Sequence, residues 1–155
     1  MVTERDRIAS LFEQALDQQP YYGPSLLNLL QRITLSTAAF RLPDTHSIWE
    51  IIAHMTAEMN YSGAVLDGHT APWIEGETTW PKMSDESEAS WQQTTNDFEA
   101  AYRDLVSRIK RLTDEQLNQR NRIPVDRSIY EMLCGTLQHN IYHAGQIALM
   151  LRVAK

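Results

Sequence analysis

The chain has 155 residues, of which 43% are hydrophobic and 22% charged, so its composition matches soluble globular proteins and excludes a disordered or membrane-spanning one. Twenty acidic residues outnumber fourteen basic ones, and the resulting net charge of -6 disfavours a nucleic-acid partner. The single cysteine, Cys134, excludes a disulfide framework and a cysteine-rich metal site, which leaves histidines and carboxylates as candidate ligands. Because residues 1–16 lack the apolar stretch of a secretory signal, we expect one cytoplasmic domain over residues 1–155, with no membrane partner.

Two helical stretches are expected in the N-terminal part of the chain. Apolar residues at helical spacing predict the first helix over residues 8–16, and it should end before Pro20 because proline disfavours a helical residue ahead of it. After the break at Gly23-Pro24, the pattern predicts a second, shorter helix over residues 25–33.

Two long helices and a long loop are expected next. Either Thr45 or Ser47 can cap a helix that ends near Gly68, since glycine is the usual residue just past a helix. Residues 69–86 show no sustained period and predict a long loop, which in a compact domain is usually functional or disordered. Residues 87–112 then carry a continuous apolar stripe and predict the third main helix.

The remaining segment ends in a long helix. Residues 112–117 predict a short helical turn and residues 118–125 a connector, after which Asp126 or Ser128 can cap the last helix. No pattern indicates strands, so we predict an all-α protein, a four-helix bundle with a long crossover between helices two and three. A long crossover joins parallel neighbours, whereas short loops join antiparallel ones, which gives the order up-down-down-up. The residues expected in its core include Ile52, Met55, Phe98, Leu105, Leu133 and Leu137.

Three histidines have positions that suit a metal site. His139 and His143 lie four residues apart, or about 40° around a helix axis, so both side chains can bind the same ion. His54 lies in the middle of the second main helix, off the centre of its apolar stripe. Three imidazoles would hold a divalent ion and leave positions open for water or substrate, as catalytic metal sites do. The alternative is that these are ordinary histidines, hydrogen-bonded in the core or at the surface.

Three further polar residues lie one helical turn from these histidines. Glu58 follows His54 on the same side of the helix, so it is our candidate catalytic residue, a proton acceptor or an orienting carboxylate. The alternative is a glutamate on the helix surface. Glu50, one turn before His54, has the same two interpretations. Gln146, one turn beyond His143, is expected either to hydrogen-bond or to pack beside its neighbours.

The other candidates are weaker. Cys134 lies about 140° around the helix from His139, so helix geometry argues against it as a ligand and favours a small buried side chain. His46 and His69 fall at the ends of the second main helix and are either a fourth ligand or part of a cap or loop.

Two tryptophans, Trp73 and Trp80, fall in the long loop. They could form an apolar lid over the metal, or anchor the loop to the helices or to a partner chain. We favour the anchor.

Several segments resemble the DinB-like superfamily of metal-dependent enzymes. They are residues 23–26 (GPSL), residues 47–50 (SIWE) leading to His54, and residues 139–147 (HNIYHAGQI). The resemblance spans most of the chain and is weakest in residues 69–86. It implies an up-down-down-up bundle, a homodimer, and a nickel or zinc ion held by the three histidines described above.

The same resemblance implies a reaction class. Relatives include bacillithiol-dependent transferases and mycothiol-dependent maleylpyruvate isomerases, in which the metal activates a low-molecular-weight thiol. We therefore expect an enzyme that uses a divalent metal to activate a thiol or water against a small electrophilic substrate, as a transferase or a hydrolase. The alternative is a non-catalytic metal-binding or dimerisation module. Neutral imidazoles suit both nickel and zinc, so the residues do not choose between the two metals.

Overall fold

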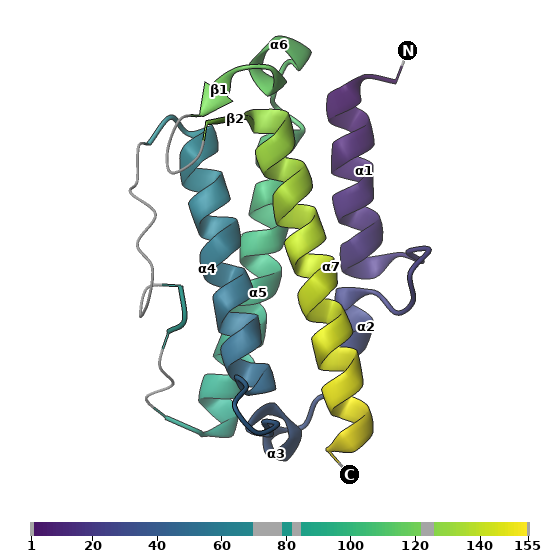
Figure 1. Cartoon of the computed structure of the whole chain (residues 1–155), viewed down its shortest axis with the longest axis vertical. Coiled ribbons are helices and arrows are strands. Elements are labelled where there is room, and N and C mark those ends of the chain that lie inside the picture. Colours follow the sequence, from purple (N-terminus) through teal and green to yellow (C-terminus); the bar gives the residue numbers. More distant parts are fainter. Residues whose placement is uncertain (1, 70–78, 82–84, 122–125, 155) are drawn as a thin grey trace.

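The computed structural model describes residues 2–69, 79–81, 85–121 and 126–154, and these residues form seven helices and one two-stranded sheet. The four long helices are α1 (Glu4–Asp17), α4 (Ile48–Leu66), α5 (Glu88–Ile109) and α7 (Ile129–Val153). The short ones are α2 (Leu26–Leu30), α3 (Leu35–Ala38) and α6 (Asp114–Leu117). In Figure 1 the long helices lie side by side, with α1 and α7 running downward and α4 and α5 running upward. The prediction of a mostly helical protein is confirmed.

The small sheet corrects the expectation that the chain has no strands. β1 (Arg120–Asn121) pairs antiparallel with β2 (Arg127–Ser128), with Arg120 opposite Ser128. Strands of two residues are too short to show an alternation of apolar and polar side chains, so the sequence pattern could not reveal them. The pair lies directly ahead of α7.

The segment after α1 also differs from its prediction. The helix expected over residues 25–33 ends at Leu30, and a further short helix, α3, follows it. At the junction, the N–H of Ile33 donates to the carbonyl of Leu30, and Thr34 caps α3 by accepting from the N–H of Thr37. Thr34 therefore begins a separate helix. In a continuous helix the N–H of Thr37 would bond to a backbone carbonyl, whereas here it bonds to the Thr34 side chain.

Serine capping boxes start the two helices that carry the candidate histidines. The Ser47 hydroxyl accepts from the backbone N–H of Glu50, while the Glu50 carboxylate accepts from the backbone N–H of Ser47. Ser128 and Glu131 make the same pair of bonds at the start of α7. The N-caps are therefore Ser47, and not Thr45, and Ser128, and not Asp126. Each capping box satisfies two N–H groups that have no partner within the helix.

The end of α4 follows the prediction. Gly68 has a φ of 80°, a conformation that a residue with a side chain rarely adopts. Its N–H donates to the Val65 carbonyl, and the N–H of His69 donates to that of Ala64. These two bonds form a Schellman motif, which satisfies the last carbonyls of the helix.

The core lies between the long helices and contains most of the residues expected there. Leu137 is the exception, since it is only partly buried and packs against the core from the edge of the inner face of α7. Trp49, which is buried on α4, donates its indole N–H to the hydroxyl of Thr94 on α5 at 2.8 Å. The residues of the prediction that are buried are Ile52, Met55, Phe98, Leu105 and Leu133.

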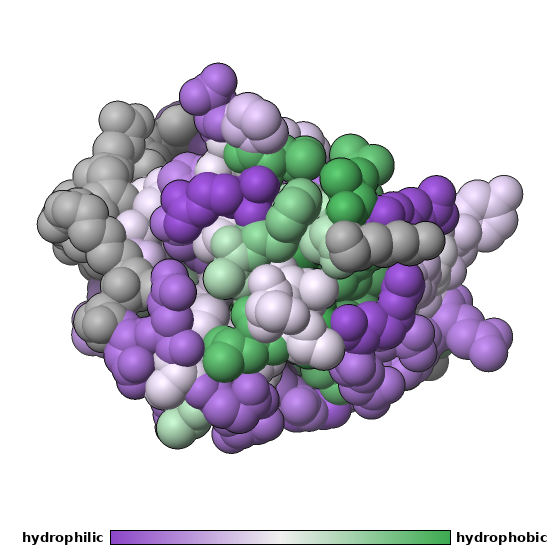
Figure 2. All heavy atoms as spheres, turned by 90° about the horizontal axis from the view of Figure 1, so that it is seen from below, coloured by the Kyte–Doolittle hydropathy of each residue, from purple (hydrophilic) through white to green (hydrophobic). Residues whose placement is uncertain are grey.

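Two features of the surface complete the description. Figure 2 shows hydrophobic side chains gathered at the end of the molecule where α7 finishes, and Leu149 and Val153 are more than half exposed there. Among the described residues, no helix combines the length and the hydrophobicity that crossing a membrane requires.

Candidate metal centre

The three predicted histidines converge between α4 and α7. The Nε2 atom of His139 lies 3.1 Å from that of His54 and 3.0 Å from that of His143. In all three residues the nitrogens that could bind an ion lie within 4.8 Å of one another. His54 and His143 are buried and His139 is partly buried. The helical register that the sequence predicted therefore brings together side chains that are 85 residues apart in the chain.

Two of the rings are oriented through their other nitrogen. The Nδ1 of His54 lies 2.5 Å from the carbonyl oxygen of Thr79, and the Nδ1 of His143 lies 2.6 Å from the side-chain oxygen of Gln146. Both partners can only accept, so each Nδ1 carries the proton and donates it. In a neutral imidazole this leaves the Nε2 atom with a free lone pair, and both lone pairs point toward His139.

Burial keeps the rings neutral. The pKa values of His139 and His143 are lowered to about 4, mainly by burial, and in His139 the two neighbouring imidazoles contribute to this shift. Burial also lowers the pKa of His54. All three rings are therefore neutral near pH 7, which is the state that binds metals.

This arrangement fits a divalent cation. Ring nitrogens that share an ion at about 2.0 to 2.1 Å lie about 3.0 to 3.4 Å apart, and the two His139 separations fall at the short end of that range. Without an ion, the Nε2 lone pairs of His54 and His143 both face the Nε2 of His139, which can carry at most one proton. A cation would neutralise the clustered lone pairs, so the donor set suits a metal better than a purely hydrogen-bonded cluster.

Residues of the crossover cover one side of the centre. Trp80 stacks on His54, with ring centroids 3.9 Å apart and planes 3° from parallel. His46 stacks on the other face of Trp80 at 3.6 Å. Trp80 also packs against the core, so it anchors the crossover to the helices, as favoured, and covers His54 as well. Trp73 lies outside the described residues.

The polar candidates Glu58, Glu50 and Gln146 have different surroundings. Glu58 is partly buried on α4, and this burial raises its pKa to about 7. Glu50 belongs to the α4 capping box and also pairs with Arg41, so the interpretation as a proton acceptor at the centre is not supported. Gln146 hydrogen-bonds to His143 of its own helix and donates to the hydroxyl of Tyr142.

The remaining candidates lie apart from the cluster. Cys134 interacts with Tyr130 one turn earlier on α7 and is not among the clustered ligands, as its helical position predicted. His46 faces Glu50 and Trp80, and His69 is exposed beyond the end of α4, so neither joins the three rings. No sequence motif indicated that the Thr79 carbonyl would hold His54, because a backbone acceptor carries no residue type that a motif could reveal.

Fold and site together define a mostly helical protein with a three-histidine candidate metal centre. The chain belongs to the DinB superfamily, whose family model matches residues 4–147, and the resemblance seen in the sequence is thereby confirmed. A search among curated proteins found no match.

Proposed function

We propose that the protein is a metal-dependent enzyme that uses one nickel or zinc ion, held by His54, His139 and His143, to activate a thiol or water against a small electrophilic substrate. The observation that carries the proposal is the convergence of three neutral imidazoles. The Nε2 atom of His139 lies 3.1 Å from that of His54 and 3.0 Å from that of His143. A divalent cation supplies the positive charge that makes a thiol or water easier to deprotonate near neutral pH. A thiol transferase and a hydrolase both fit this chemistry.

The protein's own residues orient and shield the reacting groups. The Thr79 carbonyl and Gln146 hold the rings of His54 and His143 by their Nδ1 protons. Such outer contacts fix the ring orientation and increase the basicity of the coordinating nitrogen. Trp80 covers one face of His54 and excludes water from that side.

Glu58 is the proposed proton acceptor. It follows His54 by one turn of α4, and burial raises its pKa to about 7. A carboxylate with a pKa near the working pH exchanges protons with a thiol or water more readily than an ordinary glutamate. Its task would be to take up the proton that the nucleophile loses.

We also propose three properties of the whole molecule. The helix directions in Figure 1 support an up-down-down-up four-helix bundle, formed as a single domain with its crossover between α4 and α5.

Exposed apolar side chains such as Val153 and Leu11 support a homodimer, which sedimentation at high micromolar concentration should detect as a mass twice that of the chain. The acidic composition and the single cysteine support a cytoplasmic location.

A non-catalytic module is the alternative function. Its support is that the ligands come from two helices, α4 and α7, so an ion would link those helices whether or not a reaction followed. In that case Glu58 would have no role at the centre.

Turnover measurements separate the two functions. Protein loaded with nickel or zinc would be incubated with cysteine and an activated aryl chloride, and separately with an activated ester in water. The enzyme proposal predicts product formation by wild type, none by chelator-treated protein, and a slower rate with an altered pH profile for Glu58→Gln. Metal-loaded protein that forms product no faster than chelator-treated protein on either substrate would support the module instead.

A further inference from the structure

A cavity of about 430 Å³ opens directly beside the metal centre. His143 contributes to its lining, so a molecule in the cavity lies next to one of the proposed metal ligands. Leu42 and Ile51 line it together with Leu149 and Met150 of α7, so much of its wall is apolar. A volume of this size fits a small molecule and not a macromolecule.

The described part of the cavity wall carries a negative charge. Among the described residues that line it, Asp44 is the only carboxylate and none is lysine or arginine. The nearest arginine in the sequence, Arg41, lies 3.4 Å from the carboxylate of Glu50 and is thereby paired. Among the described lining residues, an anionic molecule would meet Asp44 with no lysine or arginine to balance it, whereas a cationic one would be attracted.

Asp44 adopts an unusual backbone conformation at this wall. Its φ of 57° lies in the left-handed region that favours glycine, and Asp44 is the only described residue other than glycine with a positive φ. It occupies the third position of a turn closed by a hydrogen bond from the Thr45 N–H to the Leu42 carbonyl, with Pro43 in the second position. Glycine is the usual residue in that place. Aspartate tolerates this conformation better than most other side chains, so the turn can hold Asp44 at the wall of the cavity.

The Asp44 carboxylate is also available to a ligand. Its side chain is exposed and makes no hydrogen bond or ion pair with another described residue. Tyr142 also lines the cavity, and its hydroxyl accepts from Gln146 at 3.0 Å, which leaves its own proton free to donate. The cavity therefore offers a ligand a largely apolar wall, a free carboxylate and one hydroxyl donor.

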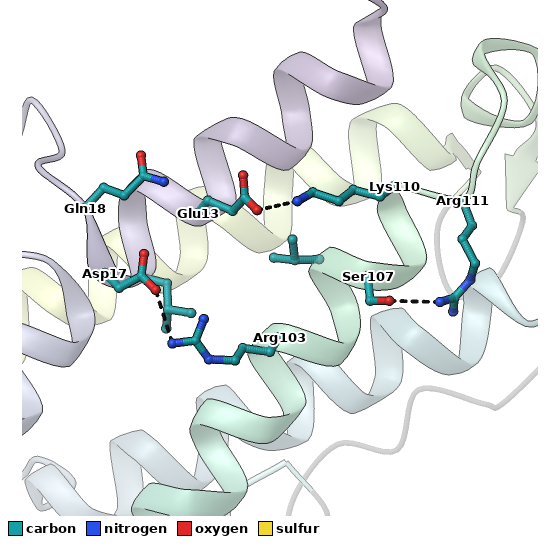
Figure 3. A pocket seen from close by; sticks show the side chains of 9 residues that line it. Glu13, Asp17, Gln18, Arg103, Ser107, Lys110 and Arg111 are labelled. Carbon is teal, nitrogen blue, oxygen red and sulfur yellow. Dashed lines mark hydrogen bonds and ion pairs between the residues drawn. The ribbon is translucent and has the colours of Figure 1, made fainter.

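A second cavity, of about 540 Å³ between α1 and α5, is lined by carboxylates that are paired with cationic side chains. There Lys110 pairs with Glu13 at 2.5 Å and Arg103 pairs with Asp17 at 3.1 Å (Figure 3). Both carboxylates of that groove are thereby paired, while Arg111, which also lines it, donates to the hydroxyl of Ser107. Asp44 has no such partner in the part of the chain that the structure describes, so the two cavities differ in whether their carboxylates are paired.

We propose that the cavity beside the metal centre binds substrates with an apolar or aromatic body and an ammonium group, and that Asp44 recognises the ammonium group. The inference deepens the proposed function, since it names the substrate class of the same site. Asp44 is here a residue that determines specificity, and it takes no part in activating the nucleophile.

The test compares three probes of similar size, benzyltrimethylammonium, benzyl alcohol and phenylacetate, titrated into chelator-treated protein and followed by NMR chemical shifts. The quaternary ammonium cannot coordinate a metal, so its binding reports the cavity alone. Wild type should bind the cation about three- to fivefold more tightly than the alcohol, as expected for a partly exposed ion pair, and phenylacetate most weakly. This preference should weaken with added salt.

Two variants make the result specific. Asp44→Asn should remove the preference for the cation while benzyl alcohol binds as before. Asp44→Gly should also remove it and should raise the melting temperature, because glycine tolerates the positive φ. Glu115→Gln on α6 changes the net charge equally but lies outside the cavity, and it should keep the preference.

Equal affinities of wild type for all three probes, or unchanged cation binding by Asp44→Asn, would overturn the proposal. Because the titration uses metal-free protein, its failure would leave the three-histidine centre intact. Conversely, a protein that bound no metal but preferred the cation would contradict the proposed function and retain this inference.

Discussion

At the scale of single residues, burial lowers the pKa of the histidines and raises the pKa of Glu58. It lowers the pKa of His139 and His143 to about 4, so in metal-free protein the unfolded chain takes up protons first as the pH falls below about 6.5. Their contribution to stability is therefore lost between about pH 6.5 and 4. Burial raises the pKa of Glu58 from 4.5 to about 7, so its contribution is present at acidic pH and lost as the pH rises through 7.

These opposite signs predict the pH dependence of a variant. In wild type, acidification destabilises the metal-free protein through the histidines and partly offsets this through Glu58. Glu58→Gln removes the offset, so its melting temperature should fall more steeply than that of wild type between pH 7 and 4.5, and should be higher than wild type at pH 8. Circular dichroism melts in chelator, with His143→Gln as a variant expected to show a shallower fall, would measure this. Parallel curves for wild type and Glu58→Gln would contradict the assigned burial of Glu58.

The site could be predicted from the sequence as far as side-chain spacing reaches. The four-residue spacing of His139 and His143 indicated a shared face, and the helical position of Cys134 indicated that it points elsewhere. Two parts could not be predicted. The bond from His54 to the Thr79 carbonyl uses a backbone atom, and the stack on Trp80 depends on how the crossover folds back, which no local pattern encodes.

At the scale of elements, the cap of α4 determines where the helix that carries His54 begins. Ser47 is buried and bonds Glu50 in both directions, whereas Thr45 is exposed and its hydroxyl donates to the Leu42 carbonyl. Ser47→Ala should therefore lower the free energy of unfolding by about 1 kcal/mol, and Thr45→Ala by clearly less. Urea denaturation followed by circular dichroism gives both values. Equal losses would mean that the helix does not start at the Ser47 box.

The stack of Trp80 on His54 predicts an optical signal from the crossover. An open-shell nickel ion at the three histidines would lie close to the indole and quench its emission. Adding nickel to metal-free protein should reduce the fluorescence of wild type and of Trp91→Phe, whose ring is buried against Trp49. Trp80→Phe should lose most of this response. Identical quenching in wild type and Trp80→Phe would place Trp80 away from the ion.

Among the elements, the long helices could be predicted and the shortest ones could not. The apolar stripes of α1, α5 and α7 extend over several turns, so they give a strong periodic signal. By contrast, α3 covers only Leu35–Ala38 and β1 only Arg120–Asn121, lengths at which a helical or strand period has no room to repeat. Asn140, fully buried on α7, is a further limit, because hydrophobic periodicity does not predict an amide in the core.

At the scale of the whole molecule, the core does not depend on the metal. Buried apolar residues extend along the long helices, from Phe12 on α1 to Met150 on α7, far beyond the three histidines. The helices therefore present the ligands already packed, and an ion adds stability in proportion to its affinity. Chelation should lower the melting temperature and leave the protein folded at room temperature.

The most direct measurement is elemental analysis of protein purified without a histidine tag. We predict one nickel or zinc ion per chain for wild type and for Cys134→Ala, whose side chain interacts with Tyr130 and lies outside the cluster. His139→Ala should lose the stoichiometric ion and retain nearly all of its helicity. Wild type that binds no divalent ion at saturation, or a His139→Ala variant that keeps the ion while Cys134→Ala loses it, would contradict the three-histidine centre.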